Sequence, residues 1–225
     1  MERFDPNNPD HLDETKYRIV KEGDVYYHVM EAVKANKAKS KVVNWAVLLH
    51  DVGKVPAYTC DEDGNTHFYK HECYSDELID GIAKRLTMDN ELRDAIKFAA
   101  NNHMLMHVFP NLKQSVAMKL MNDKNWDVLL NTGYCDAKSR GLIFSQEDWE
   151  KVESRVESLR EWFNGKQATE NIRKVINGGL IMKLRPEVTP SKEMGRIIKE
   201  TMDWIVDNGV DIEDMELIED YIRLV

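Results

Sequence analysis

Four histidines and two aspartates lie on the apolar helical stripes of five separate segments, where they could bind a metal ion. They are His28, His50, Asp51, His71, His103 and Asp136. Apolar residues recur three or four positions apart and lead to each of these segments, so the spacing predicts that the polar side chains face a helical core. Imidazole and carboxylate together suit iron, manganese, nickel, cobalt or zinc better than calcium. The set therefore predicts a site for a divalent transition metal, with one or two ions.

The adjacent pair His50 and Asp51 gives this interpretation most of its weight. Val43, Ala46 and Val47 share a helical face with His50, and Asp51 follows directly. A lone histidine on an apolar face is more often a hydrogen-bonded core residue, so no single position decides the matter. An ionised carboxylate, however, is costly to bury without a cation. The coincidence of five such segments therefore favours metal.

The chemistry that this set could perform is hydrolysis without a protein nucleophile. A divalent ion lowers the pKa of water toward neutrality and polarises a phosphoryl oxygen. Lys54 lies three residues after Asp51, and we expect its ammonium group to contact a substrate phosphate. The alternative for Lys54 is an ordinary cation at a helix C-terminus. His67 and His107 lie off the apolar stripes, so we expect them in a channel or at the surface.

The elements that must position these residues are helices. Apolar residues recur at helical spacing over 25–35, 41–50, 75–86, 91–103, 115–121, 126–132, 148–163, 172–182 and 194–206. The exception is 57–70, where short extended arms flank Asp63-Gly64, a tight-turn signal. We therefore expect an all-α fold with one small β-hairpin.

The domain organisation follows from where the long helices end. Asn164-Gly165 closes a long charged helix, and Pro186 and Pro190 interrupt the last third of the chain. We expect a lead-in at 1–23, a first domain at 24–145 and a helical C-terminal extension at 146–225.

Composition limits the classes of function. The 225 residues are 42% hydrophobic and 32% charged, which is typical of a globular protein. No apolar run approaches the roughly 20 residues of a spanning helix, and the acidic start does not resemble a signal peptide. We expect a cytoplasmic protein without a membrane partner. The three cysteines are far apart, so neither a disulfide framework nor a zinc ribbon is indicated.

Charge is distributed unevenly along the chain. The net charge of −9 argues against a broad basic surface that coats nucleic acid. The stretch 165–200 is nevertheless locally positive, whereas 201–225 is strongly acidic. Solvated helix faces and a substrate-facing role explain this pattern equally well. A substrate-facing role of 165–200 is thus one hypothesis, for which Arg173, Lys174, Arg185 and Arg196 are the candidates.

The order of the metal-ligand candidates resembles a known family. His28, His50-Asp51 and Asp136 follow the defining motif of the HD superfamily of metal-dependent phosphohydrolases, and LLHDVGK at 48–54 is a close match. The run 50–78 is similar to the HD domain of bacterial tRNA nucleotidyltransferases (CCA-adding enzymes). The similarity continues at Asn102-His103, at Asp136 and at Arg140-Gly141, and extends into the tail at 176–182 and 199–209.

The resemblance implies an HD-domain helical bundle and a role for each matched residue. It implies that His28, His50, Asp51 and Asp136 bind one metal, and that His71 and His103 bind a second metal or the substrate phosphate. Lys54 and Arg140 would also contact substrate, and the contact through 165–200 would be with tRNA. Asp51, Lys54, His71 and His103 would form the catalytic group.

The activity implied is that of a phosphatase, 2′-nucleotidase or 2′,3′-cyclic phosphodiesterase on a nucleotide or RNA terminus. Only 27 residues precede His28, which leaves no room for a nucleotidyltransferase head, so CCA addition is not expected. Two alternatives stay open. An HD-fold di-iron oxygenase would use a similar ligand set, and a non-catalytic tRNA-binding remnant would keep the fold without the reaction.

Overall fold

The structure is a computed structural model that describes residues 24–62, 66–141, 145–164 and 169–225. The chain divides into two compact units. The first consists of Met1–Val108 and Asp123–Trp149, and the second of Phe109–Asn122 and Glu150–Val225. Helices and one two-stranded hairpin make up the regular structure of the described residues. The predicted all-α fold with a small hairpin is therefore confirmed, whereas the domain boundary at 145 stays a prediction.

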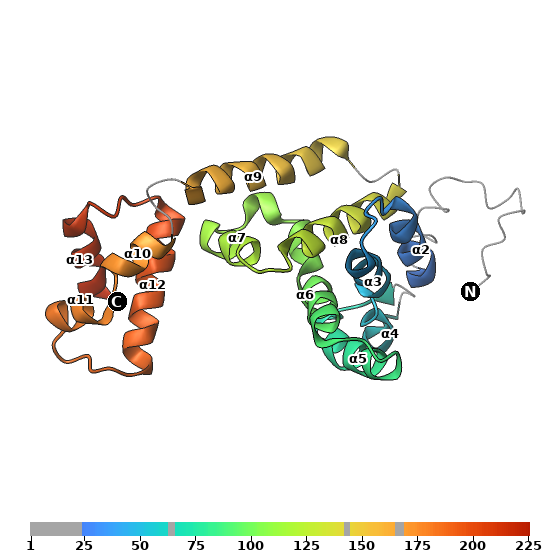
Figure 1. Cartoon of the computed structure of the whole chain (residues 1–225), viewed down its shortest axis with the longest axis horizontal. Coiled ribbons are helices and arrows are strands. Elements are labelled where there is room, and N and C mark those ends of the chain that lie inside the picture. Colours follow the sequence, from blue (N-terminus) through green and yellow to red (C-terminus); the bar gives the residue numbers. More distant parts are fainter. Residues whose placement is uncertain (1–23, 63–65, 142–144, 165–168) are drawn as a thin grey trace, which may run out of the picture. The chain divides into compact units, whose positions relative to one another are not determined.

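The first unit is a bundle of helices (Figure 1), and every candidate ligand lies within its residues. Its elements are α2 Val25–Ala35, α3 Lys41–Leu49, α4 Lys54–Ala57, β1 Thr59–Cys60, β2 Thr66–His67, α5 Glu72–Arg85, α6 Asn90–Met106 and α8 Trp126–Ser139. Side chains that accept backbone N–H groups begin several of them. Asp24 caps α2, Ser40 caps α3 and Asp89 caps α6.

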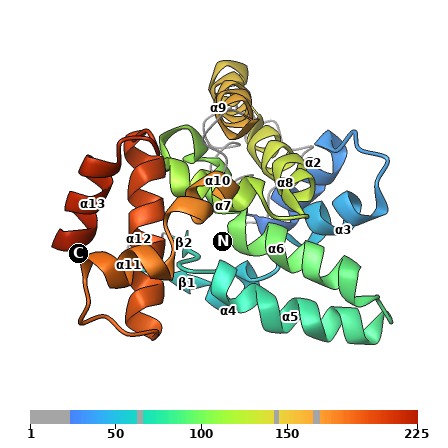
Figure 2. The same ribbon diagram turned by 60° about the vertical axis from the view of Figure 1, so that its left-hand side comes forward.

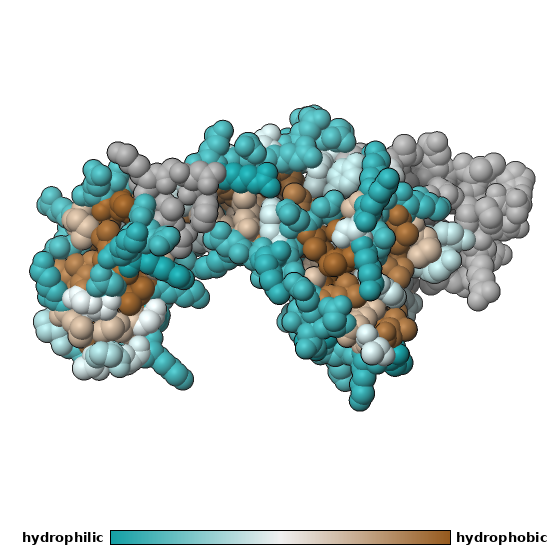
Figure 3. Space-filling view, in the orientation of Figure 1, coloured by the Kyte–Doolittle hydropathy of each residue, from teal (hydrophilic) through white to brown (hydrophobic). Residues whose placement is uncertain are grey.

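The core of the first unit lies where α6 meets its neighbours. α6 packs against α3, α5 and α8, and α2 packs against α3 and α8; α5 runs beside α6 in Figures 1 and 2. Leu49, Ile79 and Ile96 form part of one buried apolar cluster, and Val43 and Val47 belong to another. In Figure 3, apolar atoms gather over the region of α6 and α8, and hydrophilic atoms line the edges. These contacts follow the apolar stripes of the sequence.

The hairpin leads the chain from α4 to α5. β1 and β2 pair antiparallel with Thr59 opposite His67 and Cys60 opposite Thr66. This confirms the predicted hairpin, although its turn at Asp63-Gly64 lies outside the described residues. Lys54 begins the four-residue helix α4, so it lies in both the first and the last turn of this helix.

The second unit collects the remaining helices. They are η2 Phe109–Asn111, α7 Gln114–Met121, α9 Gln146–Asn164 from Glu150 onward, α10 Thr169–Val175, α11 Gly178–Leu184, α12 Lys192–Asn208 and α13 Met215–Leu224. Asp207 on α12 accepts the backbone N–H of Ser115 (2.8 Å) and its hydroxyl (3.1 Å). This contact fastens the first turn of α7 to α12 and explains why 109–122 group with the C-terminal helices.

The sequence predicted one helical run at 172–182, but the structure has two helices there. Asn177 adopts an extended backbone, and its side chain accepts the N–H groups of Gly179 (2.9 Å) and Leu180 (3.2 Å). This N-cap starts α11 anew after α10. Within the described residues, no helix combines the length and apolar character needed to cross a bilayer.

Candidate metal centre

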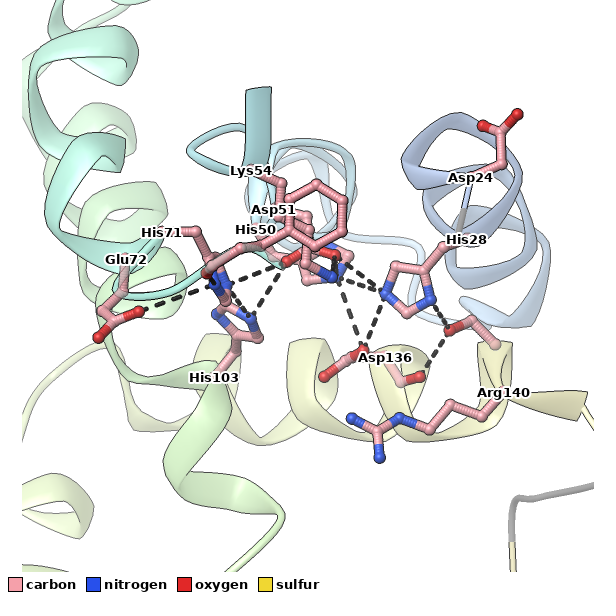
Figure 4. A network of polar contacts seen from close by, with 12 residues as sticks. Asp24, His28, His50, Asp51, Lys54, His71, Glu72, His103, Asp136 and Arg140 are labelled. Carbon is pink, nitrogen blue, oxygen red and sulfur yellow. Dashed lines mark hydrogen bonds and ion pairs between the residues drawn. The ribbon is translucent and has the colours of Figure 1, made fainter. Parts of the chain in front are cut away.

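The six predicted ligands come together inside the first unit, although they come from five separate segments. Each is at most 9% exposed. Figure 4 shows them converging from the ends and inner faces of α2, α3, α5, α6 and α8. They are His28, His50, Asp51, His71, His103 and Asp136.

Two glycines allow the helices to approach closely enough. A Cβ at Gly53 would overlap the carbonyl oxygen of His71 and lie 2.8 Å from Ser75 Oγ, so the chain after Asp51 packs directly on the start of α5. A Cβ at Gly133 would lie 2.5 Å from Met106 Cγ. Gly133 therefore permits the close packing of α8 on α6 that brings two ligand-bearing helices together.

One set of donor atoms surrounds the Oδ2 atom of Asp51. His28 Nε2 lies 3.0 Å and His50 Nε2 lies 3.3 Å from this oxygen. Asp136 Oδ1 completes the set at 3.0 Å from His28 Nε2 and 3.8 Å from His50 Nε2. Two imidazole nitrogens and two carboxylate oxygens thus face one another at spacings that a single transition-metal ion can use.

A second set of donor atoms surrounds the other oxygen of Asp51. Oδ1 lies 3.3 Å from His71 Nε2 and 3.4 Å from His103 Nε2. It is buried and accepts no hydrogen bond. A buried carboxylate oxygen without a hydrogen bond is costly, so this atom fits a bound cation. Asp51 therefore stands between the two sets, with one oxygen toward each (Figure 4).

The hydrogen bonds of the imidazoles fix which nitrogen faces the centre. Nδ1 of His50, His71 and His103 lies 2.8–3.2 Å from the carbonyl oxygen three residues earlier. A carbonyl only accepts, so each Nδ1 donates its proton. For His28, Ser139 Oγ donates to a backbone carbonyl (2.6 Å) and so accepts from Nδ1 (2.9 Å). All four Nε2 atoms consequently point inward as potential ligands, the arrangement that such outer partners give metal-binding histidines.

The inward Nε2 atoms lie so close in pairs that, if all four imidazoles were neutral, the lone pairs on facing nitrogens would repel each other. His28 and His50 approach to 3.3 Å through Nε2, as do His71 and His103. Protons or metal ions must separate such pairs. The donor set of imidazole nitrogen and carboxylate oxygen fits a divalent transition metal.

The carboxylates give the site a strong attraction for positive charge. Burial lowers the pKa of His50, but the charges of Asp51 and Asp136 outweigh it and raise that pKa to about 10. Burial raises the pKa of Asp51, but His50 and the other imidazoles hold it well below its usual range. Burial instead dominates at His103 and lowers its pKa. Burial likewise raises the pKa of Asp136, but hydrogen bonds from His107 and the other imidazoles hold it well below its usual range. Both acids are therefore ionised at neutral pH and require cations beside them.

Lys54 supplies one of these cations. Its Nζ lies 2.6 Å from Asp51 Oδ2, and its side chain is 20% exposed. The sequence predicted that Lys54 contacts a substrate phosphate, whereas the structure first pairs it with a ligand carboxylate. A metal at Asp51 would release this ammonium toward the cavity.

His107 belongs to the site, although the sequence predicted a channel or surface position for it. Its Nε2 lies 2.7 Å from Asp136 Oδ2 and 2.9 Å from a guanidinium nitrogen of Arg140. One ring nitrogen cannot serve both groups, and we assign its proton to the carboxylate because the charge strengthens that bond. His107 follows His103 by four residues, but it lies just past the end of α6, and no apolar stripe of the sequence marks it. It orients Asp136 and leaves Arg140 as a cation beside the centre.

The donor atoms open onto a cavity of about 360 Å³. His28, His71, His103 and Asp136 form its metal side. Its other lining residues are Lys54, Phe68, Tyr69, Met104 and Arg140. The volume falls within the range of small-molecule sites. Of the predicted substrate-binding residues, Lys54, His71, His103 and Arg140 all line this cavity.

Comparison with known proteins identifies the first part of the chain. The family model described as HD domain matches residues 24–124. Residues 24–124, which are just under half of the chain, are thus similar to an HD domain. The match places this part in a superfamily of metal-dependent hydrolases and confirms the resemblance predicted from the sequence. It covers five of the six candidate ligands, and Asp136 follows it.

The curated relatives of this chain include proteins named Multifunctional CCA protein. That of Aromatoleum aromaticum is 30% identical over 130 residues, which cover 53% of this chain and 31% of that protein. That of Azoarcus sp. is 29% identical over 129 residues, or 52% and 30%. The match thus spans about a third of the length of these relatives. No solved structure matches.

Proposed function

We propose that this protein is a metal-dependent phosphohydrolase that cleaves a phosphomonoester or cyclic phosphodiester at a centre of two ions bridged by Asp51. The observation that carries the proposal is the position of the Asp51 carboxylate. Each of its oxygens faces its own pair of imidazole nitrogens, at 3.0–3.3 Å on one side and 3.3–3.4 Å on the other. His28, His50 and Asp136 would hold one ion, and His71 and His103 the other.

The ions would supply hydroxide at neutral pH and polarise the phosphoryl oxygen. The residues of the chain supply the rest. Asp51 and Asp136, both ionised, hold the charge of the centre in place, and His107 orients Asp136 through its 2.7 Å hydrogen bond. Lys54 and Arg140 line the cavity and would bind the anionic oxygens of the substrate.

These two cations favour phosphohydrolysis over the di-iron oxygenase alternative. The donor set itself suits both reactions, because both use imidazole and carboxylate. A lysine and an arginine beside the donor atoms, however, select an anionic substrate. The complete ligand set also speaks against a remnant that only binds RNA, since such a protein has no need of Asp51.

We further propose that the substrate is a nucleotide or an RNA end, which the names of the relatives support. The predicted tRNA contact through 165–200 receives less support from the ion pairs of the second unit. Arg196 is held by Glu193 (2.7 Å) and Glu200 (2.6 Å), and Arg185 by Glu187 (2.9 Å). This part of the hypothesis depends on Arg173 and Lys174, which are exposed.

The test combines metal analysis with a substrate panel. Protein purified without added metal is analysed for iron, manganese, nickel, cobalt and zinc, reloaded, and assayed with adenosine 2′-monophosphate and adenosine 2′,3′-cyclic monophosphate. Oxygen consumption is recorded in parallel. We expect phosphate release or ring opening without oxygen uptake. Oxygen uptake without hydrolysis would establish the oxygenase alternative.

Lys54 offers a variant that separates substrate binding from metal binding. Lys54→Met should lower kcat/KM but retain both ions, because it removes a competing cation from Asp51. Lys84→Met, on the exposed face of α5, is the matched control and should leave both measurements unchanged. Loss of metal from Lys54→Met would contradict the assigned role.

A further inference from the structure

An exposed aromatic side chain lies at the cavity that holds the candidate metal centre. Tyr69 lines this cavity together with Phe68 and Met104, yet its side chain is 72% exposed. A single exposed aromatic residue is common at a protein surface, but this one lines the cavity of the candidate centre, and aromatic side chains that line such cavities commonly contact ligands. The metal and phosphate roles assigned above do not use Tyr69.

The ring of Tyr69 is held in a defined orientation. It stacks on His67, with ring centroids 5.1 Å apart and planes inclined by 11°. His67 Nε2 in turn lies 2.9 Å from Asp61 Oδ2 across the hairpin, where β1 pairs with β2. One face of the Tyr69 ring is thus covered by His67, and the exposure of the side chain leaves the rest open to a ligand.

The backbone ties this aromatic residue to the metal centre. His71 lies two residues later, and its Nδ1 donates to the carbonyl oxygen of Phe68 (3.2 Å). Lys70 between them has a φ of 55°, a left-handed conformation that non-glycine residues rarely adopt and that concentrates at functional sites. This turn allows Tyr69 and His71 to line the same cavity although they are only two residues apart.

The ring of the neighbouring Phe68 is less accessible to a ligand than that of Tyr69. The ammonium group of Lys54 lies 5.8 Å from the centroid of its ring, and Tyr58 packs against it at a centroid distance of 6.0 Å. Phe68 therefore supports Lys54 from one side. Tyr69 is the aromatic residue of this cavity with an exposed ring.

We propose that Tyr69 is a stacking platform for the nucleobase of the substrate. A base on the Tyr69 ring would extend the His67–Tyr69 stack by one ring, while its phosphate lies among Lys54, Arg140 and the metal donors. Aromatic stacking accepts every base because each has a π-face. The proposal rests on the proposed phosphohydrolase function and specifies its substrate class as nucleotides, with little discrimination among bases.

The experiment compares a substrate that has a base with one that lacks it. Adenosine 2′-monophosphate and glycerol 2-phosphate are both secondary alkyl phosphates, and only the first can stack. Removal of one base–aromatic stack costs a factor of roughly 5 to 150. Tyr69→Ala should therefore lower kcat/KM for the nucleotide by this factor and leave that for glycerol 2-phosphate unchanged, whereas Tyr69→Phe should behave like the wild type.

Tyr26→Ala is the matched control. Tyr26 is similarly exposed at 67% and pairs with another ring, Tyr27, but it does not line the cavity. This variant should leave both substrates unaffected. An equal effect of Tyr69→Ala on both substrates, or no effect on either, would overturn the proposal.

A binding measurement separates this proposal from the proposed function. The affinity of wild-type and Tyr69→Ala protein for adenosine 2′-monophosphate is measured by calorimetry, and saturation-transfer NMR reports contact with the base protons. Base contact that Tyr69→Ala abolishes would support the platform even if the wild type hydrolysed no phosphate. Hydrolysis of both substrates without base contact would refute the platform alone.

Discussion

Substitution of Asp51 by asparagine tests the bridging arrangement most directly, because it removes the charge and keeps the size. Two unit charges 4 Å apart interact by about 4 kcal/mol at an effective dielectric constant of about 20. A divalent ion doubles this attraction before the desolvation of the carboxylate is subtracted. We therefore expect each ion to bind at least roughly a thousandfold more weakly in Asp51→Asn.

The helical fold should survive this substitution. Asp51 is completely buried, so its neutral replacement removes one desolvation cost but leaves Lys54 and His50 without their counter-charge, and we expect a folded protein of lower stability. Circular dichroism should show an unchanged spectrum, while metal content and a chelator competition titration show loss of both ions. Asp80→Asn, at an exposed ion pair with Lys97, is the control and should bind metal normally. Two ions bound with unaltered affinity in Asp51→Asn would refute the bridging role.

Three further predictions address the remaining parts of the centre. His103→Ala should lose one ion and retain the other, so metal analysis should give half the wild-type content; complete loss would show that the ligands were divided wrongly. The pKa of His50, raised to about 10 despite its burial, keeps this imidazole protonated in the metal-free protein at neutral pH. Metal must displace that proton, so the affinity of the protein for metal should rise as the pH increases toward 10. Calorimetry in buffers of different ionisation enthalpy should detect proton release on metal binding. Proton uptake would contradict the assignment. Gly53→Ala should push the start of α5 away, because the added Cβ would overlap His71. A chelator titration should then show weaker binding of the ion held by His71 and His103 alone. Equal weakening of both ions would point to a general loss of stability.

The sequence predicts the fold and the membership of the site because both depend on periodicity. His103 ends an apolar stripe of α6, and its burial at 1% follows from that stripe. Asn177 shows the limit of this reasoning. The apolar spacing continues through it, but its side chain competes for the backbone N–H groups and starts a new helix. Periodicity therefore predicts which face is buried better than where an element ends.

Residues that join the site through loops and helix ends escape such a pattern. His107 lies just past the end of α6 and is half-buried, so no apolar stripe singles it out. Tyr69 is exposed, and only the left-handed turn at Lys70 brings it to the cavity. A sequence pattern that selects buried positions cannot select either of them.

The number of bound ions is the feature of the site that the spacing of residues in the sequence predicts least well. Either of two arrangements is compatible with the order of the ligands, because a carboxylate can bind one ion through both oxygens or two ions through one oxygen each. The choice depends on where the imidazoles lie around Asp51. Since α2 brings His28 to one oxygen while α5 and α6 bring His71 and His103 to the other, the packing of these helices places Asp51 where it would bridge the two ions of the proposed centre. The proposed number of ions therefore rests on the helix packing rather than on the motif.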